Sequence, residues 1–372
     1  MIKSRLTKIK WCEVFMFAER LNRARKAAGL SMSALAQEVG VSANAIKKYE
    51  HGENMPSSGK MLKLAKALNV RTEYFFRPVK VDLKGVEYRK RANTPQKLLD
   101  QINGDVMEQA ERWVELLELY PDSVKPVPQF SLPDNLPDLV STPEDIEKLA
   151  ELMRAEWQLG LNPIPDMIDT LESKGAMIIS TSIEVNKKFD GLAGSIENTP
   201  VIVISSHQPG DRQRFTLVHE LGHLVLHARL AEGLDEEKAC HHFAGAFLLP
   251  RQALIQHLGG HRQAIEAQEL FILKQEFGLS MMAILMRAGQ CDIVSSNLQK
   301  NYFMQFNKLG WRTKEPGEQY PNEETWLFKQ LVYRALGEDY IGESKAAELL
   351  LMPLSSFHKE RKLGAMSATA DQ

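Results

Sequence analysis

The sequence predicts an α+β protein that is predominantly helical. We expect an all-α N-terminal domain, a central domain with a small sheet and a helical C-terminal region. The chain has 372 residues, so two or three domains are expected. Short segments with helical apolar spacing and cap residues fill positions 17–77 and recur beyond residue 260. Three strand-like runs lie between residues 176 and 206.

The composition is that of an ordinary water-soluble protein, with 44% hydrophobic and 25% charged residues. No apolar run approaches the ~18–20 residues of a transmembrane helix, so no membrane partner is expected. The three cysteines, Cys12, Cys240 and Cys291, are scattered along the chain. They cannot build a disulfide framework, and a cytoplasmic location is therefore expected.

The net charge of −2 hides an asymmetry between the two ends of the chain. Residues 1–80 contain 16 Lys and Arg against 6 Asp and Glu, a formal charge of +10, which leaves −12 for the remainder. A basic head on an acidic body is typical of a nucleic-acid-binding module joined to another domain. A solvated basic face without a partner is the alternative.

Residues 17–77 predict five short helices. The first ends at Gly29, a natural helix-terminating residue, and the last is the segment "TEYFF". The three helices between them start at serine N-caps: Ser31, Ser42 and Ser57. The tight turn "EVGVS" between the second and third helices predicts a helix-turn-helix. Its second helix would lie in the major groove of double-stranded DNA.

The polar positions of this recognition helix are Ser42, Asn44, Lys47 and Lys48. Side chains near its N-terminus would reach base edges, and the lysines would neutralise phosphates. "RLNRARKAAGLSMSALAQEVGVSANAIKKYEHGENMPSSGKMLKLAKALNV" resembles the XRE-type helix-turn-helix of phage repressors, over about residues 16–78. It departs from that family at Met32, where a glutamine is common. The resemblance implies that residues 1–80 bind a DNA operator, and a homodimer is compatible with the sequence.

Residues 81–141 are expected to form one helix and a linker. Leu99, Val106, Trp113 and Tyr120 recur every seven residues. This spacing fits a short coiled-coil seam or a helix packed on a neighbouring domain. The proline-rich segment 121–141 has the composition of a linker.

A new domain is expected from Thr142, which begins a helix with a capping box and a proline at its first position. A second helix, 165–175, precedes the strand-like runs 176–181, 191–197 and 200–206. Two further helices are expected at 212–228 and 236–250. Residues 257–372 are expected to be mainly helical and to serve as a sensor or a partner-binding region.

The segment "RFTLVHELGHLVLH" contains His219 and His223, four residues apart and therefore on one helix face. Such a pair can hold one metal ion, and Glu220 would act as general base on a water bound to that ion. His227 would lie ~12 Å along the helix axis from His219, too far to join the same site. The third ligand is expected on the following helix, which offers five side chains: Asp235, Glu236, Glu237, His241 and His242. Helical spacing does not choose among them.

"GLAGSIENTPVIVISSHQPGDRQRFTLVHELGHLVLH", followed by "EEKACHHFAGAFLLP", resembles the ImmA/IrrE family of metallopeptidases. The resemblance covers about residues 142–255 and implies a zincin-like metallopeptidase domain at 142–256. Aligning Phe243 with the family phenylalanine makes Glu237 the third metal ligand, with Glu236 as the alternative. The family's Ala-Asn pair is Cys240-His241 here. His241 is either a tolerated substitution, an extra ligand or a group that polarises the substrate.

Two functions follow from these resemblances. The first is a DNA-binding transcriptional regulator with a metal-dependent endopeptidase domain, using Zn²⁺ or alternatively Mn²⁺. It would cleave a regulatory protein, such as a repressor in a stress response, or this chain itself. The second is a non-proteolytic transcription factor or antitoxin-type regulator whose peptidase-like domain is a sensor or docking module. The intact Glu220 favours the first, because a binding-only site does not need a general base.

Overall fold

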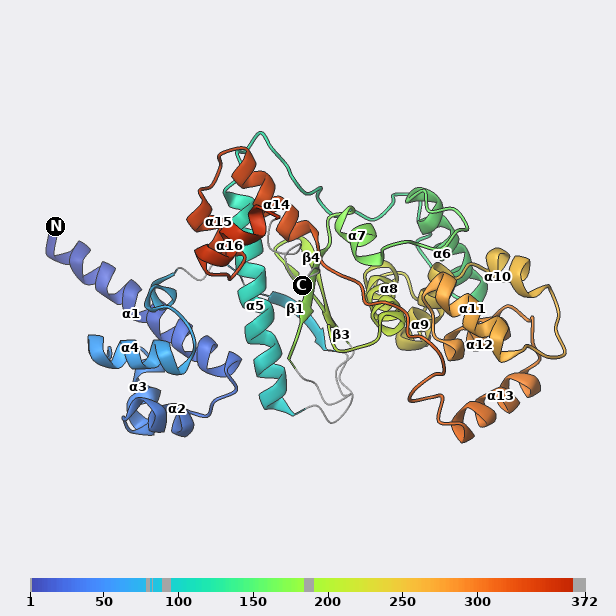
Figure 1. Cartoon of the computed structure of the whole chain (residues 1–372), viewed down its shortest axis with the longest axis horizontal. Coiled ribbons are helices and arrows are strands. Elements are labelled where there is room, and N and C mark those ends of the chain that lie inside the picture. The colour runs from blue at the N-terminus through green and yellow to red at the C-terminus, as the bar shows by residue number, and fades with distance from the viewer. Residues whose placement is uncertain (1, 78–80, 82, 89–94, 184–190, 364–372) are drawn as a thin grey trace, which may run out of the picture. The chain divides into compact units, whose positions relative to one another are not determined.

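The structure is a computed structural model that describes residues 2–77, 81, 83–88, 95–183 and 191–363, with side chains omitted for 2–13 and 83–88. The described residues form two compact units. The N-terminal unit contains the described residues before Gly85, residues 95–119 and Ile183. The C-terminal unit contains 85–88, 120–182 and 191–363. The predicted α+β, predominantly helical fold is confirmed (Figure 1).

The helices of the N-terminal unit are α1 (Ile2–Ala27), α2 (Met32–Val39), α3 (Ala43–Glu50), α4 (Ser58–Ala67), the 3₁₀ helix η1 (Thr72–Phe76) and α5 (Gln96–Glu118). Ser31 and Ser42 accept hydrogen bonds from backbone N–H groups in the first turns of α2 and α3, as their cap positions predict. Ser57 occupies the N-cap of α4 without a side-chain cap bond. Helix α1 begins at Ile2, well before the predicted start near residue 17.

A small apolar core holds α1 to α4 and η1 together, and Phe17, Ile46 and Phe75 are fully buried in it. A buried ion pair reinforces the link between α1 and α3. Arg25 Nε lies 2.5 Å from Glu50 Oε1 and Arg25 Nη2 lies 2.9 Å from Oε2. This bidentate pair fixes α3, the predicted recognition helix, against α1.

Helix α5 packs along α1 through the face that carries Gly104 and Glu111. Leu99, Val106 and Trp113 are all buried within the chain. Arg20 on α1 donates to Glu111 at 2.5 Å. The heptad residues are buried within this chain, which supports the packing interpretation over a coiled-coil seam. The fourth heptad residue, Tyr120, belongs to the C-terminal unit, where its hydroxyl donates to the Leu331 carbonyl at 2.7 Å.

The C-terminal unit contains a four-stranded sheet in the order β1-β3-β4-β2. The strands are β1 (Leu83–Tyr88), β2 (Met177–Thr181), β3 (Gly191–Ile196) and β4 (Thr199–Ser205). Strand β4 pairs parallel with β2 and antiparallel with β3. The three predicted strands are present. Strand β1 was not predicted, because residues 81–141 were assigned to a helix and a linker.

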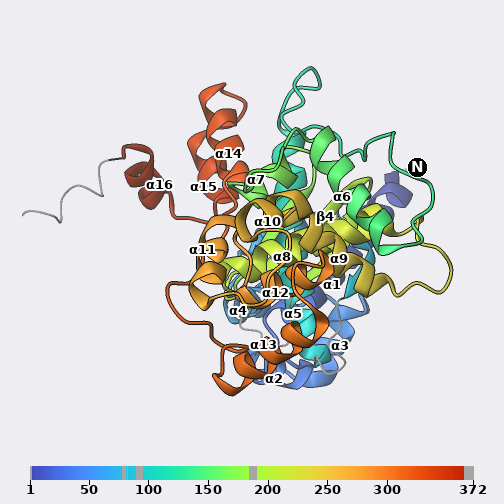
Figure 2. The same cartoon turned by 90° about the vertical axis from the view of Figure 1, so that its right-hand side faces the viewer.

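The helices of this unit are α6 (Pro143–Glu156), α7 (Met167–Glu172), α8 (Gly210–Leu226), α9 (Glu236–Leu248), α10 (Arg251–Leu258), α11 (Ala267–Phe277), α12 (Met281–Gln290), α13 (Ser296–Lys308), α14 (Leu327–Gly337), α15 (Glu343–Leu349) and α16 (Leu354–Arg361). Helix α6 starts with the predicted capping box of Thr142 and Asp145. Helices α8 and α9 lie side by side in both views (Figures 1 and 2). One apolar core runs from Leu136 to Phe306, so it continues beyond residue 256 into α10–α13.

Segment 121–141 lacks helix and strand, as a linker would, but it is not a free tether. Leu136 and Val140 are buried in the core of the C-terminal unit. The Val140 N–H donates to the Arg229 carbonyl at 2.7 Å, and the Val140 carbonyl accepts from Ala231 N–H at 3.0 Å. These contacts hold the end of the segment on the C-terminal unit, although its composition alone predicts a linker. Within the described residues, no helix is both long and apolar enough to cross a membrane.

Candidate metal centre, cavity and DNA-binding helix

Helix α8 carries the HExxH segment and is held by close backbone approaches on two sides. A Cβ atom at Gly222 would lie 3.3 Å from the Cα and Cβ atoms of Cys240 on α9. A Cβ atom at Gly191 on β3 would lie 2.5 Å from the side chain of Thr216 on α8. These two glycines therefore allow α8 to pack against the neighbouring helix and the sheet at short distances. The buried Arg214 anchors α8 further by pairing with Glu323 and donating to the Ile164 carbonyl at 2.6 Å.

The packing of α8 on α9 brings His219, His223 and Glu237 together. The two Nε2 atoms of the histidines lie 3.1 Å apart. Glu237 places one carboxylate oxygen 3.5 Å from His219 Nε2 and the other 3.5 Å from His223 Nε2. Zinc bonds of ~2.0–2.1 Å in tetrahedral geometry separate ligand atoms by about 3.3–3.4 Å. The three groups therefore fit the ligand set of a zinc-type ion.

Glu236, the alternative third ligand, contacts the other nitrogen of one of these histidines. Its Oε1 atom lies 3.0 Å from His223 Nδ1. A carboxylate at this position makes Nδ1 the protonated nitrogen and leaves Nε2 as the atom that can bind a metal. Glu236 therefore orients His223, a role that its spacing in the sequence did not indicate.

Two other members of the predicted set are engaged elsewhere. Asp235 is the N-cap of α9 and accepts from Lys238 N–H at 3.1 Å. His242 Nε2 lies 2.6 Å from Glu147 Oε1 on α6. His227 is exposed at the C-cap of α8.

Glu220 is 2% exposed and lies where α8 faces β3, since its Oε1 would be 3.6 Å from a Cβ atom at Gly191.

A buried ion-pair network joins α6, α9 and α12. Arg287 on α12 forms a bidentate pair with Glu147 on α6, with the second contact at 2.5 Å, and His242 on α9 adds a third contact. Burial of Glu147 acts to raise its pKa, but the hydrogen bonds from His242 and Arg287 outweigh burial and lower the pKa to about 2. The network therefore fixes α9, which carries Glu237, against α6 and α12.

A cavity of about 990 Å³ lies beside His241 and His242 on α9. Its walls include the apolar side chains of Phe215, Met282, Met286 and Trp311. His241 also lines the cavity, and its ring centroid lies 4.6 Å from that of His219. Through His241, the cavity therefore comes close to His219. Its lining also includes five cationic side chains: Arg212, Lys238, Lys274, Arg312 and Lys314.

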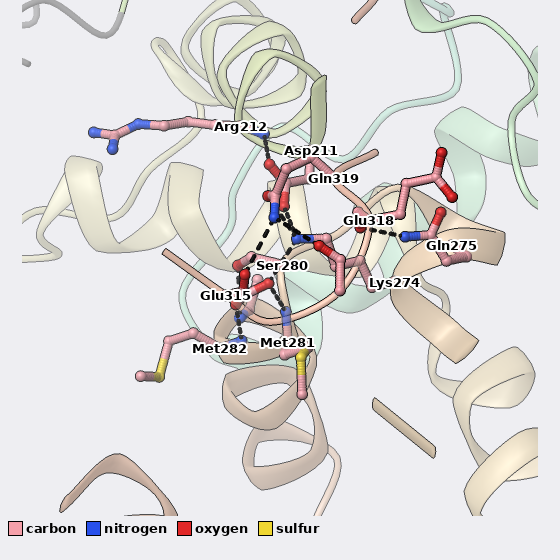
Figure 3. A network of polar contacts seen from close by, with 12 residues as sticks. Asp211, Arg212, Lys274, Gln275, Ser280, Met281, Met282, Glu315, Glu318 and Gln319 are labelled. Atoms are coloured by element: carbon pink, nitrogen blue, oxygen red, sulfur yellow. Dashed lines mark hydrogen bonds and ion pairs between the residues drawn. The ribbon is translucent and has the colours of Figure 1, made fainter. Parts of the chain in front are cut away.

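A second buried network lies at this cavity (Figure 3). The fully buried Lys274 places its ammonium 2.8 Å from Glu315 and 3.0 Å from Asp211. Burial acts to lower the pKa of Lys274, but Glu315 and Asp211 outweigh it, so the pKa is raised. Glu315 also accepts from Met281 and Met282 N–H at the start of α12, both at 3.1 Å. These contacts fix the cavity-lining segment 311–319 to α8, α11 and α12.

The four residues predicted to contact DNA are all exposed on α3 or at its N-cap: Ser42, Asn44, Lys47 and Lys48. Ile46 points into the core of the N-terminal unit. The Ser42 hydroxyl accepts from Ala45 N–H at 3.2 Å. It therefore caps α3, as its N-cap position predicts, so Ser42 has this structural role beside the predicted DNA contact.

The fold and these groups of residues define a chain that joins a helix-turn-helix unit to a metallopeptidase-type domain. Residues 21–75 match the helix-turn-helix family, and residues 171–288 match the IrrE N-terminal-like domain of the M78 peptidase family. The chain thus contains an XRE-type helix-turn-helix segment and an IrrE/ImmA-like domain, as the two sequence resemblances predicted.

Curated relatives match over short stretches. A transcriptional regulator in the ATPase CF(0) region of Rhodospirillum rubrum is 41% identical over 58 residues, which cover 16% of this chain and 54% of that protein. The cryptic phage CTXphi transcriptional repressor RstR of Vibrio cholerae is 40% identical over 52 residues, 14% of this chain and 46% of that one. The chain therefore spans about half the length of the curated relatives it matches.

Among solved structures, ComR from Streptococcus suis is 12% identical, with 93% of this chain and 94% of ComR covered. The TM-score is 0.16, which is too low to bear on the fold or function of this chain.

Proposed function

We propose that the chain is a DNA-binding transcriptional regulator whose C-terminal unit is a metal-dependent endopeptidase. The observation that carries the proposal is the arrangement of His219, His223 and Glu237, whose ligand atoms lie 3.1–3.5 Å apart beside a cavity. Glu220 is the adjacent carboxylate in the HExxH segment. This is the set of groups that metal-assisted peptide hydrolysis requires.

In the proposed reaction, a bound Zn²⁺ or Mn²⁺ would polarise the scissile carbonyl and make a water molecule more acidic. Glu220 would accept the proton from that water and return it to the leaving amine. Its low exposure keeps the proton transfer away from bulk solvent. His219, His223 and Glu237 would hold the ion, and Glu236 would keep His223 in the tautomer that binds metal.

The substrate would enter the cavity beside His241, with an apolar side chain against Phe215, Met282 and Trp311. We propose a separate regulatory protein, such as a repressor, as substrate. Self-cleavage within segment 121–141 is less favoured, because Leu136 and Val140 are buried and a protease needs an extended, accessible chain.

The N-terminal unit would bind a double-stranded operator through α3, with Asn44 at base edges and Lys47 and Lys48 at phosphates. The formal charge of +10 on residues 1–80 and the matched relatives that are named as transcriptional regulators support this part. Because both units belong to one chain, a protein bound near the operator would meet the peptidase at a raised effective concentration.

The test compares the full-length wild type with Glu220→Gln and with the exposed control Glu232→Gln. Each protein is assayed for metal content, for operator binding and for cleavage of a peptide library made from denatured cellular protein. Glu220→Gln should keep metal and DNA binding but lose cleavage, because only the general base is removed. Glu232→Gln should behave like the wild type.

If Glu220→Gln cleaves as fast as the wild type, the proposed peptidase mechanism is wrong. If no variant cleaves but all bind metal and DNA, the domain is better described as a sensor or docking module of a non-proteolytic regulator.

A further inference from the structure

His241 lies one helical turn after Glu237 on α9 and therefore on the same face of that helix. One ligand atom from each of His219, Glu237 and His241 can be chosen so that all three lie within 4.8 Å of one another. The ring centroid of His241 lies 4.6 Å from that of His219. The corresponding distance between His219 and His223 is 4.8 Å. His241 is thus as close to His219 as the second histidine of the HExxH segment.

The hydrogen bonding of His241 determines which of its nitrogens can bind a metal. Its Nδ1 atom lies 2.6 Å from the backbone carbonyl oxygen of Glu237. Because a carbonyl oxygen only accepts, Nδ1 carries the proton of the neutral imidazole and Nε2 carries the lone pair. A histidine ligand usually donates its other ring N–H to a carbonyl or carboxylate in this way. His223 has the same arrangement with Glu236.

The same tautomer argues against a different role for His241. A residue that stabilises the developing oxyanion of a substrate must donate a hydrogen bond from the atom that faces it. In His241 the donor nitrogen is already directed to Glu237, and Nε2 of the neutral ring can only accept or coordinate. Phe215 lies beside the ring, with centroids 5.8 Å apart, and helps to hold its orientation.

We propose that His241 is a fourth protein ligand of the metal ion in the resting protein, through Nε2. The proposal rests on the metal site described under the proposed function. Two i, i+4 pairs, one on α8 and one on α9, would then surround the ion. His241 is exposed on the cavity wall, unlike the buried His219, so it can leave when a substrate enters. Until it leaves, a tetrahedral ion has no open position for a reacting water.

The test uses the full-length protein, loaded with Co²⁺ for spectroscopy and with Zn²⁺ for affinity by chelator competition. His241→Asn is compared with His227→Asn, an exposed histidine at the end of α8 that serves as the matched control. His241→Asn should weaken Zn²⁺ binding at least ~10-fold, the lower end of what even outer-shell partners contribute. Its Co²⁺ absorption should change and respond to added azide, because an open position has been created. His227→Asn and wild type should show neither effect.

Thermal unfolding of the metal-free proteins checks that both variants fold, which the exposure of both histidines leads us to expect. If His241→Asn binds Zn²⁺ as tightly as the wild type, with the same Co²⁺ spectrum and no azide response, His241 is not a ligand. The His219–His223–Glu237 site is unaffected by that result. If the wild type itself binds no metal, both proposals fail together, and His219→Ala would show no further loss.

Discussion

Replacing Glu147 by glutamine should strongly destabilise the C-terminal unit. Glu147 forms a bidentate pair with Arg287, which is 1% exposed, and also contacts His242. A carboxyl group whose pKa is about 2, instead of its ordinary 4.5, stabilises the folded state by about 3 kcal/mol once it is ionised. Glu147→Gln keeps the shape of the side chain but leaves the guanidinium of Arg287 buried without its counter-charge. Removal of one partner from a buried pair typically costs about 3–5 kcal/mol, which agrees with this value.

Urea unfolding near pH 7 measures the loss of stability, and thermal unfolding should show a decrease of roughly 6–12 °C for a unit of this size. The control is Glu151→Gln, one turn further along α6 and exposed, for which a change within about 0.5 kcal/mol is expected. Adding Arg287→Gln to Glu147→Gln should recover part of the loss, because the unpaired buried charge is then removed.

The pH dependence gives an independent check. Because the folded pKa of Glu147 is lowered, its contribution is fully present above about pH 4.5 and is lost as the pH falls towards 2. The stability difference between wild type and Glu147→Gln should therefore shrink over this range. If Glu147→Gln were no less stable than Glu151→Gln at pH 7, the argument that this network fixes α6, α9 and α12 would be refuted.

Three further predictions concern other parts of the molecule. Burial, followed by the nearby acidic side chains, raises the pKa of Glu172 to about 8. The ionised form is therefore disfavoured in the folded state, so Glu172→Gln should gain stability relative to wild type as the pH rises from about 4.5 to 8. At pH 7 urea unfolding should show a gain of roughly 1–3 kcal/mol. Equal stability of the two proteins at all pH values would contradict this. In Gly222→Ala the new Cβ would lie 3.3 Å from the α9 backbone and should push α8 and α9 apart by a few tenths of an ångström. This variant should bind Zn²⁺ more weakly in chelator competition. Gly337→Ala, which has open space around it, is the control and should bind Zn²⁺ as tightly as the wild type. Lys47→Ala should weaken binding of the full-length protein to all DNA sequences and reduce the slope of log K against log[salt] by about 1. Asn44→Ala should mainly reduce discrimination between operator and random DNA, measured by fluorescence anisotropy. If the two variants reduced discrimination equally, the assigned roles would be contradicted.

Features that depend on a few neighbouring residues were predictable from the sequence. The N-caps Ser31 and Ser42 and the capping box at Thr142 satisfy backbone groups only three residues away. The pairing of His219 with His223 follows from the 3.6-residue period of one helix. The predominantly helical fold and the three central strands were predictable on the same basis, because local spacing and turn residues determine them.

Features that join distant segments required the tertiary structure. Helical spacing left five candidates for the third ligand, and the family resemblance selected Glu237. The contact of α8 with α9 at Gly222 brings Glu237 to the two Nε2 atoms and Glu236 to His223 Nδ1, the role that the sequence did not indicate. The pairing of Glu147 with Arg287 spans 140 residues, and nothing in the local sequence indicates it. Segment 121–141 has the composition of a linker, yet the C-terminal unit buries Val140. Helix period and capping act within one turn of chain. The partner of a buried side chain is instead determined by packing between elements, because the free energy of that packing depends on surfaces that only the folded chain brings together.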